Sequence, residues 1–396
     1  MGLVAWTLIA VLAALLTWVG WGVRVRLLTR QHLSKTHLPV ALESTTVGDF
    51  PPSHHLEDVP WHCTRESYGE ANALQMIALQ KGRAASRDEV NFLMGATYGA
   101  VAMPGKEVGF SPFTDPELGH AVAAPYLGLV RHFYTTDDPK LYLRALRFHL
   151  FRGHPLRIPL DASVLYGRKG FFPHSDLLVG YDEKGFFYYA TVALEGTPLE
   201  PGIRAPGHQG RWMADETLLE AVESVSKGFR YPWRYIFTLF EPWPEQSDLK
   251  PVWRRNAKLL MGGEKRGPRQ GAAAIAQTAD KVRKRWRSLG AAQLKQFLSA
   301  AYTRQDNADF LRARFAGNDG LMRSANLLEQ AGQNYQSVGQ AIQQGIRSQA
   351  QANQVAAWLD EAAAAEWEVG SIFARVATSA LQPMMHAGDI GEPAQP

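Results

Sequence analysis

Patterns typical of β-strands stop near residue 250 of this 396-residue chain. Before that point, helical segments are followed by short runs rich in branched and aromatic residues; after it, long Ala- and Gln-rich stretches favour helices alone. A chain of this length suggests two folded units, and 46% apolar residues are enough to build a core in each. The sequence therefore predicts an α+β domain over 60–245 and an all-α domain over 271–382, with a flexible tail at 383–396.

Within the first domain, the helical segments precede the strands. Apolar residues recur at helical spacing over 64–80 and 139–151, while Ser86 with Glu89 forms a capping box and Asp115 before Pro116 begins another helix. Strand-like runs follow at 156–160, 176–181, 186–192 and 235–240, with a turn at 182–185 between the second and the third. Strands that follow helices in this way predict an antiparallel sheet instead of alternating βαβ units.

The second domain is expected to contain helices only. Gly290, Gly317 and Gly320 interrupt its helix-forming stretches. The expected helices cover 271–287, 291–302, 325–351 and 356–381. Because no repeated signature accompanies their spacing, the pattern does not favour a solenoid.

The first 23 residues carry no charged side chain. A helix of this length spans roughly 30 Å, enough to cross the hydrocarbon core of a membrane. Arg24, Arg26 and Arg30 follow the stretch and nothing basic precedes it, which is unlike a cleaved signal peptide. The sequence predicts one N-terminal transmembrane helix in the inner membrane, a tether over 24–59 and globular domains in the cytoplasm. A buried helix of a soluble domain is the alternative.

Positive charge is concentrated in residues 250–290, which hold twelve Lys and Arg side chains against Glu264 and Asp280. Trp253 and Trp286 lie within this band. One interpretation is a solvated basic linker over 246–270 and an exposed helix face. The functional alternatives are a surface for anionic lipid or for an acidic carrier protein. Nucleic acid is not expected, because no recognised binding fold accompanies the charge.

The single cysteine, Cys63, excludes an intrachain disulfide framework and a cysteine-cage metal site. The spacing places Cys63 at the beginning of the helix predicted over 64–80, where unpaired backbone N–H groups favour a thiolate. A nucleophilic cysteine also needs a base from elsewhere in the chain. His174, at the start of a predicted strand, fits that role, although each residue taken alone is also compatible with a structural position in the core.

Three stretches resemble papain-like cysteine acyltransferases of the butirosin biosynthesis protein H type and, more remotely, C39-type peptidases: 61–64 (WHCT), 153–166 (GHPLRIPLDASVLY) and 174–189 (HSDLLVGYDEKGFFYY). The helical region is similar to the C-terminal domain of that family, above all over 359–374 (LDEAAAAEWEVGSIFA). The resemblance implies a papain-like domain with Cys63 as nucleophile and His174 as base, acting through an acyl-thioester intermediate. The expected activity is that of a membrane-anchored acyltransferase or amidase, with a C39-like peptidase as an alternative.

The chain departs from this pattern at the residue that orients the catalytic histidine. The family has Asp or Asn about sixteen residues after the histidine, where this chain has Ala190. Thr191, Asp161 and Asp176 are the candidates to replace it, and His62 is a candidate oxyanion donor beside the backbone N–H of Cys63. Loss of the orienting group would favour the other hypothesis, a catalytically silent module that serves as a membrane-tethered binding or scaffold protein.

Other chemistries have little support in the sequence. His54, His55, His62 and Cys63 are all metal-ligand types, but their spacing matches no standard zinc pattern. The chain also lacks a Gly-rich phosphate loop, a GxSxG elbow and an HExxH motif. No cofactor or metal is therefore expected.

Overall fold

A computed structural model describes residues 36–44, 47–64, 69–103, 105, 107–192, 202–204, 207, 209–262 and 269–379. The chain forms two compact units. The first comprises residues up to His55 together with His132–Tyr188 and Arg211–Leu239, and the second comprises Leu56–Arg131, Tyr189–Gly210 and the chain from Phe240 onward. The predicted membrane helix over 1–23 and tail over 383–396 lie outside the described residues.

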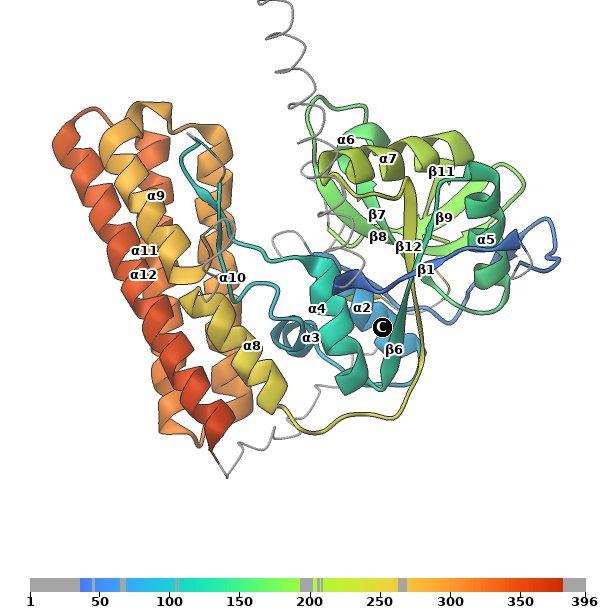
Figure 1. Cartoon of the computed structure of the whole chain (residues 1–396), viewed down its shortest axis with the longest axis horizontal. Coiled ribbons are helices and arrows are strands. Elements are labelled where there is room, and N and C mark those ends of the chain that lie inside the picture. Colours follow the sequence, from blue (N-terminus) through green and yellow to red (C-terminus); the bar gives the residue numbers. More distant parts are fainter. Residues whose placement is uncertain are drawn as a thin grey trace, which may run out of the picture. The chain divides into compact units, whose positions relative to one another are not determined.

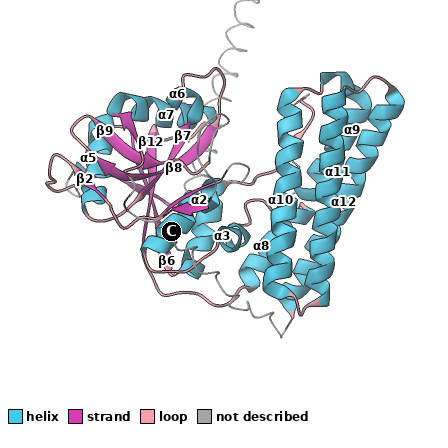
Figure 2. Cartoon of the chain, turned by 180° about the vertical axis from the view of Figure 1, so that it is seen from behind, coloured by secondary structure: helices cyan, strands magenta, loops and turns pink. Residues whose placement is uncertain are grey.

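The first unit is built on an eight-stranded mixed sheet (Figures 1 and 2). The strands run in the order β1-β6-β12-β7-β8-β9-β11, with β2 also paired to β8. Their bounds are β1 Pro39–Ala41, β2 His54–His55, β6 Leu129–Thr136, β7 Leu156–Asp161, β8 Pro173–Tyr181, β9 Gly185–Tyr189, β11 Arg211–Ala214 and β12 Tyr235–Pro242. The α+β prediction is confirmed, but the sheet is not wholly antiparallel because β1 pairs with β6 in parallel.

Two helices cover the middle of this sheet. All six residues of β7 are buried, so both of its faces are covered. Helix α5 (Pro139–Phe151) contacts β7 and β8, and helix α7 (Asp215–Gly228) contacts β7 and the short helix α6 (Ala162–Leu165). Asp138 begins α5 by accepting hydrogen bonds from the backbone N–H groups of Lys140 and Leu141. The predicted strands and the turn between β8 and β9 are confirmed here.

The segment predicted as a tether contributes to the sheet. Pro39–Ala41 forms β1 and His54–His55 forms β2, which pairs with Gly180 and Tyr181 of β8. Tyr181 also donates a hydrogen bond from its hydroxyl to the carbonyl of Pro51. Local periodicity did not reveal these strands, because their partners lie far along the chain and the strands themselves are very short.

The second unit combines short strands with most of the helices. The elements before residue 250 are β3 Trp61–Cys63, α2 Gly69–Gln80, α3 Arg87–Met94, β4 Val101–Ala102, β5 Phe110–Ser111, α4 Pro116–Ala123, the 3-10 helix η2 Ala124–Leu127 and β10 Gly202–Arg204. The predicted caps are confirmed: Ser86 accepts a hydrogen bond from the N–H of Glu89 at 3.1 Å, and Asp115 accepts one from the N–H of Glu117 at 2.9 Å.

The C-terminal helical region was predicted correctly in kind, but with different boundaries. It consists of α8 Lys250–Met261, α9 Gly271–Arg285, η3 Trp286–Ser288, α10 Ala291–Phe315, α11 Asp319–Gln344 and α12 Gln349–Thr378. The predicted helix over 325–351 is divided at Gly345, whose φ of 82° ends α11. Gln and Ala continue on both sides of this glycine, so helix propensity alone did not mark the break.

The segment expected as a basic linker over 246–270 contains helix α8. Trp253 of this helix is fully buried against the rings of Phe92, Phe315 and Phe373, with ring centroids 4.6, 5.4 and 4.8 Å away. A buried aromatic side chain of this size contributes several kcal/mol, so α8 is part of a core. The expected boundary between 245 and 271 therefore does not separate two cores.

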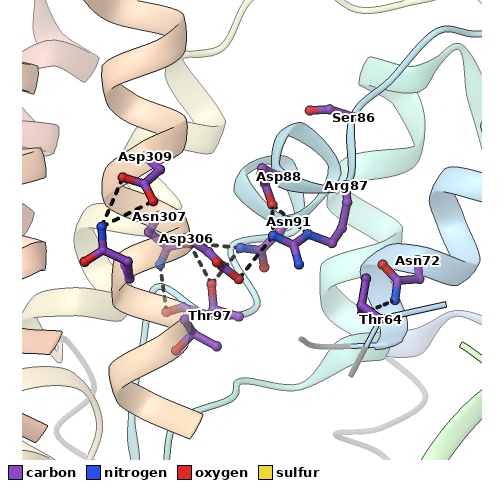
Figure 3. Close-up of polar contacts among 12 residues, drawn as sticks. Thr64, Asn72, Ser86, Arg87, Asp88, Asn91, Thr97, Asp306, Asn307 and Asp309 are labelled. Carbon is purple, nitrogen blue, oxygen red and sulfur yellow. Dashed lines mark hydrogen bonds and ion pairs between the residues drawn. The ribbon is translucent and has the colours of Figure 1, made fainter. Parts of the chain in front are cut away.

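Buried polar contacts explain why α3 and its following loop share a unit with the C-terminal helices. Asn91 of α3 donates from Nδ2 to Thr97 Oγ1 at 2.7 Å and to Asn307 Oδ1 at 2.9 Å (Figure 3). Arg304 of α10 donates to the carbonyls of Thr97 and Gly99. Because buried polar groups need these partners, the 91–99 segment and α10 are held to each other.

Within the described part of the chain, no helix has the length and apolar character that a membrane crossing requires.

Candidate functional site

The strand β3 positions Cys63 in the second unit. All three of its residues are buried, Cys63 with 3% of its surface exposed, and they pair in antiparallel register with β10, Cys63 opposite Gly202. On the other side, Trp61 donates from Nε1 to the carbonyl of Ala190 at 2.9 Å, and its ring stacks on Tyr189 at 5.5 Å. Cys63 is thus the last residue of a strand held by segments more than 120 residues away.

This placement corrects the predicted helix over 64–80 at its beginning. Cys63 ends a strand, and the first described helical residue is Gly69 of α2, while residues 65–68 lie outside the described residues. The pairing with β10 is a long-range contact, which helical spacing in the local sequence does not report.

The chain that follows Cys63 is fastened by Asn72, a residue that the sequence analysis missed. Asn72 is fully buried on α2 and donates from Nδ2 to Thr64 Oγ1 at 2.8 Å and to the carbonyl of Thr191 at 2.7 Å (Figure 3). The N–H of Thr64 also donates to the carbonyl of Thr191. Asn72 therefore ties α2 to Thr64, which directly follows Cys63, and to Thr191 in the segment after β9. Its position one turn into a helix that follows the cysteine was the only signal in the sequence.

His62 lies on the opposite face of β3 from Cys63, because successive side chains of a strand alternate. Its Nδ1 hydrogen-bonds Gln75 Oε1, and its backbone N–H contacts Met76 Sδ at 3.0 Å, so both contacts are to α2. Burial lowers the pKa of His62, although the hydrogen bond to Gln75 acts in the other direction. His62 therefore packs between β3 and α2, with its side chain on the face of β3 opposite to that of Cys63.

Thr191 uses its backbone to join these elements. It is fully buried, and its carbonyl accepts hydrogen bonds from both Thr64 and Asn72. Neighbouring Val192 forms a parallel bridge with Thr64. Thr191 thus supports the strand that carries Cys63, and it belongs to the second unit, whereas His174 belongs to the first.

The first unit holds His174 near the beginning of β8, opposite Leu160 of β7. Its Nε2 lies 2.9 Å from Oδ1 of Asp176. The Asp176 side chain is 1% exposed, whereas 19% of the His174 side chain is exposed. Residues two apart in a strand project from the same face, so the strand itself brings the imidazole and the carboxylate together. Of the three candidates for the orienting group, Asp176 is the one placed against His174.

Asp161, in the same unit, binds the residues of a helix cap and a loop. Its Oδ1 accepts hydrogen bonds from the N–H and hydroxyl of Ser163 and from the N–H of Phe172, and its Oδ2 accepts one from Ser224 at 2.6 Å. Burial alone would raise the pKa of Asp161, but these hydrogen bonds together lower it. Asp161 caps α6 and fixes the loop before His174.

Tyr166 and Tyr188 feel the negative charge of Asp176, and Arg211 binds Tyr166; none of the three was predicted as a site residue. Arg211 of β11 donates from Nη1 to the hydroxyl of Tyr166 at 2.8 Å. Burial raises the pKa of Tyr166 and of Tyr188 on β9, and the negative charge of Asp176 raises both further. Both phenols therefore stay protonated at neutral pH.

The histidines considered as metal ligands take part in packing. His54 and His55 form β2, where the His54 ring contacts Phe151 and the His55 ring contacts Phe187. Among the described residues, no group of three or more His, Cys, Asp or Glu side chains is placed to hold a metal ion.

The basic band over 250–290 is distributed over α8 and α9, and several of its charges have protein partners. Lys281 donates to the carbonyls of Met103 and Glu107, and Arg283 pairs with Asp280 and Asp360. Of the two tryptophans, Trp253 is fully buried and only Trp286 reaches the surface, beneath the guanidinium of Arg287 at 4.5 Å. Over 250–262 and 269–290, which the structure describes, the band is therefore not a single surface of interleaved aromatic and basic side chains.

No known protein-family model matches the chain, and no curated protein matches it.

Proposed function

We propose that the protein is a cysteine-dependent acyltransferase or amidase of papain-like type, with Cys63 as nucleophile, His174 as base and Asp176 as the residue that orients the imidazole. The observation that carries this proposal is the 2.9 Å contact between His174 Nε2 and Asp176 Oδ1. It supplies the carboxylate that the family position after the histidine lacks. With Nε2 bound to Asp176, Nδ1 is the nitrogen assigned to proton exchange.

The proposed reaction is acyl transfer in two steps. The Cys63 thiol gives its proton to His174, and Sγ attacks the carbonyl carbon of a thioester or amide. The tetrahedral intermediate collapses to an acyl-thioester on Cys63 while His174 returns the proton to the departing thiol or amine. An acceptor amine or water then attacks the acyl group and restores the thiol; water makes the enzyme an amidase, and a peptide bond as substrate makes it a C39-like peptidase.

Three features support the papain-like proposal. His174 lies on a sheet, Cys63 comes before helix α2 in the sequence, and a helical region follows the mixed part. The details differ from the resemblance, because the sheet is mixed and Cys63 ends a strand. The His174–Asp176 pair also differs from a contact in a closed core, because 19% of the His174 side chain is exposed. With residues 1–23 as a membrane anchor, the enzyme would act at the cytoplasmic face of the inner membrane.

The test is the reactivity of the only cysteine. Intact-protein mass spectrometry after treatment with a thiol-directed electrophile reports Cys63 alone, since the chain has no other thiol. Fast single labelling of the folded full-length chain that is lost in His174→Ala, but kept in the matched variant His154→Ala, supports the proposal. Acyl-thioester donors used in the same assay would add the mass of the acyl group.

The alternative is a catalytically silent module that binds or scaffolds a membrane partner. The burial of Cys63, only 3% exposed, favours it, because an inaccessible thiol is the ordinary state of a structural cysteine. Labelling that occurs only after unfolding, with the same rate in wild type and His174→Ala, would establish this alternative and exclude the enzyme.

A further inference from the structure

Exposed aromatic rings and basic side chains gather at one place in the first unit. We call this the aromatic-basic patch. It comprises the loop after α6, residues 168–173, and the turn at the end of α7, residues 227–234. The rings of Phe171, Phe172 and Phe229 are 40%, 49% and 49% exposed. Large apolar side chains are normally exposed singly, so three in one patch indicate an interaction surface.

Four rings of the patch form a row, those of Phe171, Phe229, Tyr231 and Trp233. Phe171 and Phe229 make an edge contact with centroids 5.6 Å apart, and the row continues through Tyr231 at 5.8 Å and Trp233 at 6.4 Å. The Phe171 ring lies directly on Gly228, where an added Cβ would come within 2.3 Å of it. The two segments thus present one surface, in keeping with the neighbouring positions of α6 and α7 (Figures 1 and 2).

The backbone holds these rings in their exposed positions. Asp161 accepts from the N–H of Phe172, Ser163 donates to the carbonyl of Gly170, and Ser224 of α7 donates to the same Asp161. In the other segment, the N–H of Tyr231 donates to the carbonyl of Ser226, and Arg230 adopts a left-handed φ of 57°. Hydrogen bonds therefore hold the backbone of both segments in place. The exposed rings contribute less to stability than buried ones would, because their apolar surface stays in contact with water.

Positive charge surrounds the row of rings. Five cations belong to the patch: Arg168, Lys169, Lys227, Arg230 and Arg234. Two carboxylates contact them, since Glu223 pairs with Lys227 and Arg234, and Asp137 accepts from the backbone N–H of Arg234. The patch is thus clearly cationic, and its charge comes from both segments.

We propose that the aromatic-basic patch docks onto an anionic lipid surface. Aromatic rings are enriched at the headgroup level of membranes, and Lys and Arg side chains beside them attract anionic lipids. Each segment carries both rings and cations, and in 227–234 they are interleaved. This combination matches a lipid surface, which is apolar inside and anionic at the headgroups. An acidic protein would complement the charge of the patch, but charge complementarity alone would not explain why the phenylalanine rings are exposed. This surface is separate from the basic band over 250–290.

Vesicle-dependent hydrogen exchange of the full-length chain tests the proposal. Vesicles of phosphatidylcholine alone are compared with vesicles that also contain phosphatidylglycerol, so that any insertion of residues 1–23 is common to both. Docking predicts slower amide exchange in 168–172 and 227–234 only with the anionic vesicles. The double variant Arg168→Glu, Lys169→Glu should weaken this protection about tenfold or more, since each cation near an anionic surface contributes appreciably. Phe172→Ser should weaken it as well.

The matched control is Arg254→Glu, Lys284→Glu, which changes the net charge equally at exposed positions of α8 and α9. Protection retained in this control supports the proposal. If both double variants lose the same amount of protection, the effect comes from net charge and not from the patch, and the proposal is overturned. Equal exchange with neutral and anionic vesicles would overturn it too, as would protection by an acidic polypeptide such as polyglutamate without any protection by anionic vesicles.

Discussion

Each unit contains a buried carboxylate in contact with a basic side chain, and the two contacts differ in what surrounds them. In the second unit, Arg304 and Glu366 are both fully buried, and Arg304 donates from Nε and Nη2 to the two carboxylate oxygens at 2.7 and 3.0 Å. Tyr335 donates to the same carboxylate at 2.7 Å. In the first unit, Asp176 is buried but His174 keeps 19% of its side chain exposed.

This difference in exposure distinguishes a pair that supports the fold from a pair that a substrate could reach. A fully buried pair with every partner in place fixes α10 against α12 but has no access to a substrate. A buried carboxylate beside a partly exposed imidazole can hold the ring and still leave it accessible. The same kind of contact is therefore fully enclosed in the second unit and partly exposed in the first, where the proposed mechanism uses it.

The largest expected effect comes from breaking the fully buried pair. Arg304→Ala leaves Glu366 buried without its main partner, so we expect the free energy of unfolding to fall by about 3–5 kcal/mol. Urea unfolding followed by circular dichroism measures this. Arg312→Ala, which breaks a surface pair with Glu329, is the control and should cost about 1 kcal/mol or less. A loss at Arg304 no larger than at Arg312 would contradict the structural role.

Removal of Asp176 should act on reactivity instead. In Asp176→Ala the imidazole loses its partner, and a thiol left near its ordinary pKa of about 8.5 is only a few per cent thiolate at pH 7. We expect Cys63 to be alkylated about tenfold more slowly, with Asp176→Asn less affected because its amide oxygen still accepts a hydrogen bond. Asp138→Ala is the control, since Asp138 is an exposed carboxylate that caps α5. Equal rates in Asp176→Ala and wild type would remove Asp176 from the site.

Asn72 offers a test of the support around Cys63. Asn72→Ala removes one buried and one partly buried hydrogen bond, whereas the longer hydrogen bond from the N–H of Thr64 to the carbonyl of Thr191 remains. We expect the free energy of unfolding to fall by about 1–3 kcal/mol. Thermal unfolding of Asn72→Ala and of Asn353→Ala, an exposed position on α12, gives the comparison. Similar melting temperatures in both variants would show that Asn72 does not hold this segment.

The smallest effect concerns His62 and pH. Burial lowers the folded-state pKa of His62 below its ordinary value near 6.5, so the unfolded chain binds the proton more readily. Its contribution to stability is therefore complete above about pH 6.5 and is lost as pH falls below that value, with a slope of about 1.4 kcal/mol per pH unit at most. His62→Gln should flatten this part of the stability profile. An unchanged slope between pH 5 and 7 would contradict it.

The comparison also shows how far the sequence could predict the site. Asp176 was one of three candidates, but its spacing from His174 was not used to choose it. The structure shows that alternation within β8 brings the two side chains together, a short-range geometry that can be read from sequence. Asn72 was not found, because its partners Thr64 and Thr191 become neighbours only when β3 and the segment after β9 come together. The burial of Trp253 was missed for the same reason, since its contacts Phe92, Phe315 and Phe373 are dispersed over the chain.

By itself, the sequence determined the local elements: the capped beginnings of α3, α4 and α5, the strands from β7 to β9 with their turn, and the helical character of the C-terminal region. Helix propensity, capping and strand alternation depend on residues that are close together in the sequence, so a short stretch is enough to predict them. Tertiary structure alone decided that Cys63 ends a strand, that α8 is a core helix and that Arg304 meets Glu366. These outcomes depend on which distant surfaces exclude water together, and no short stretch of sequence specifies that.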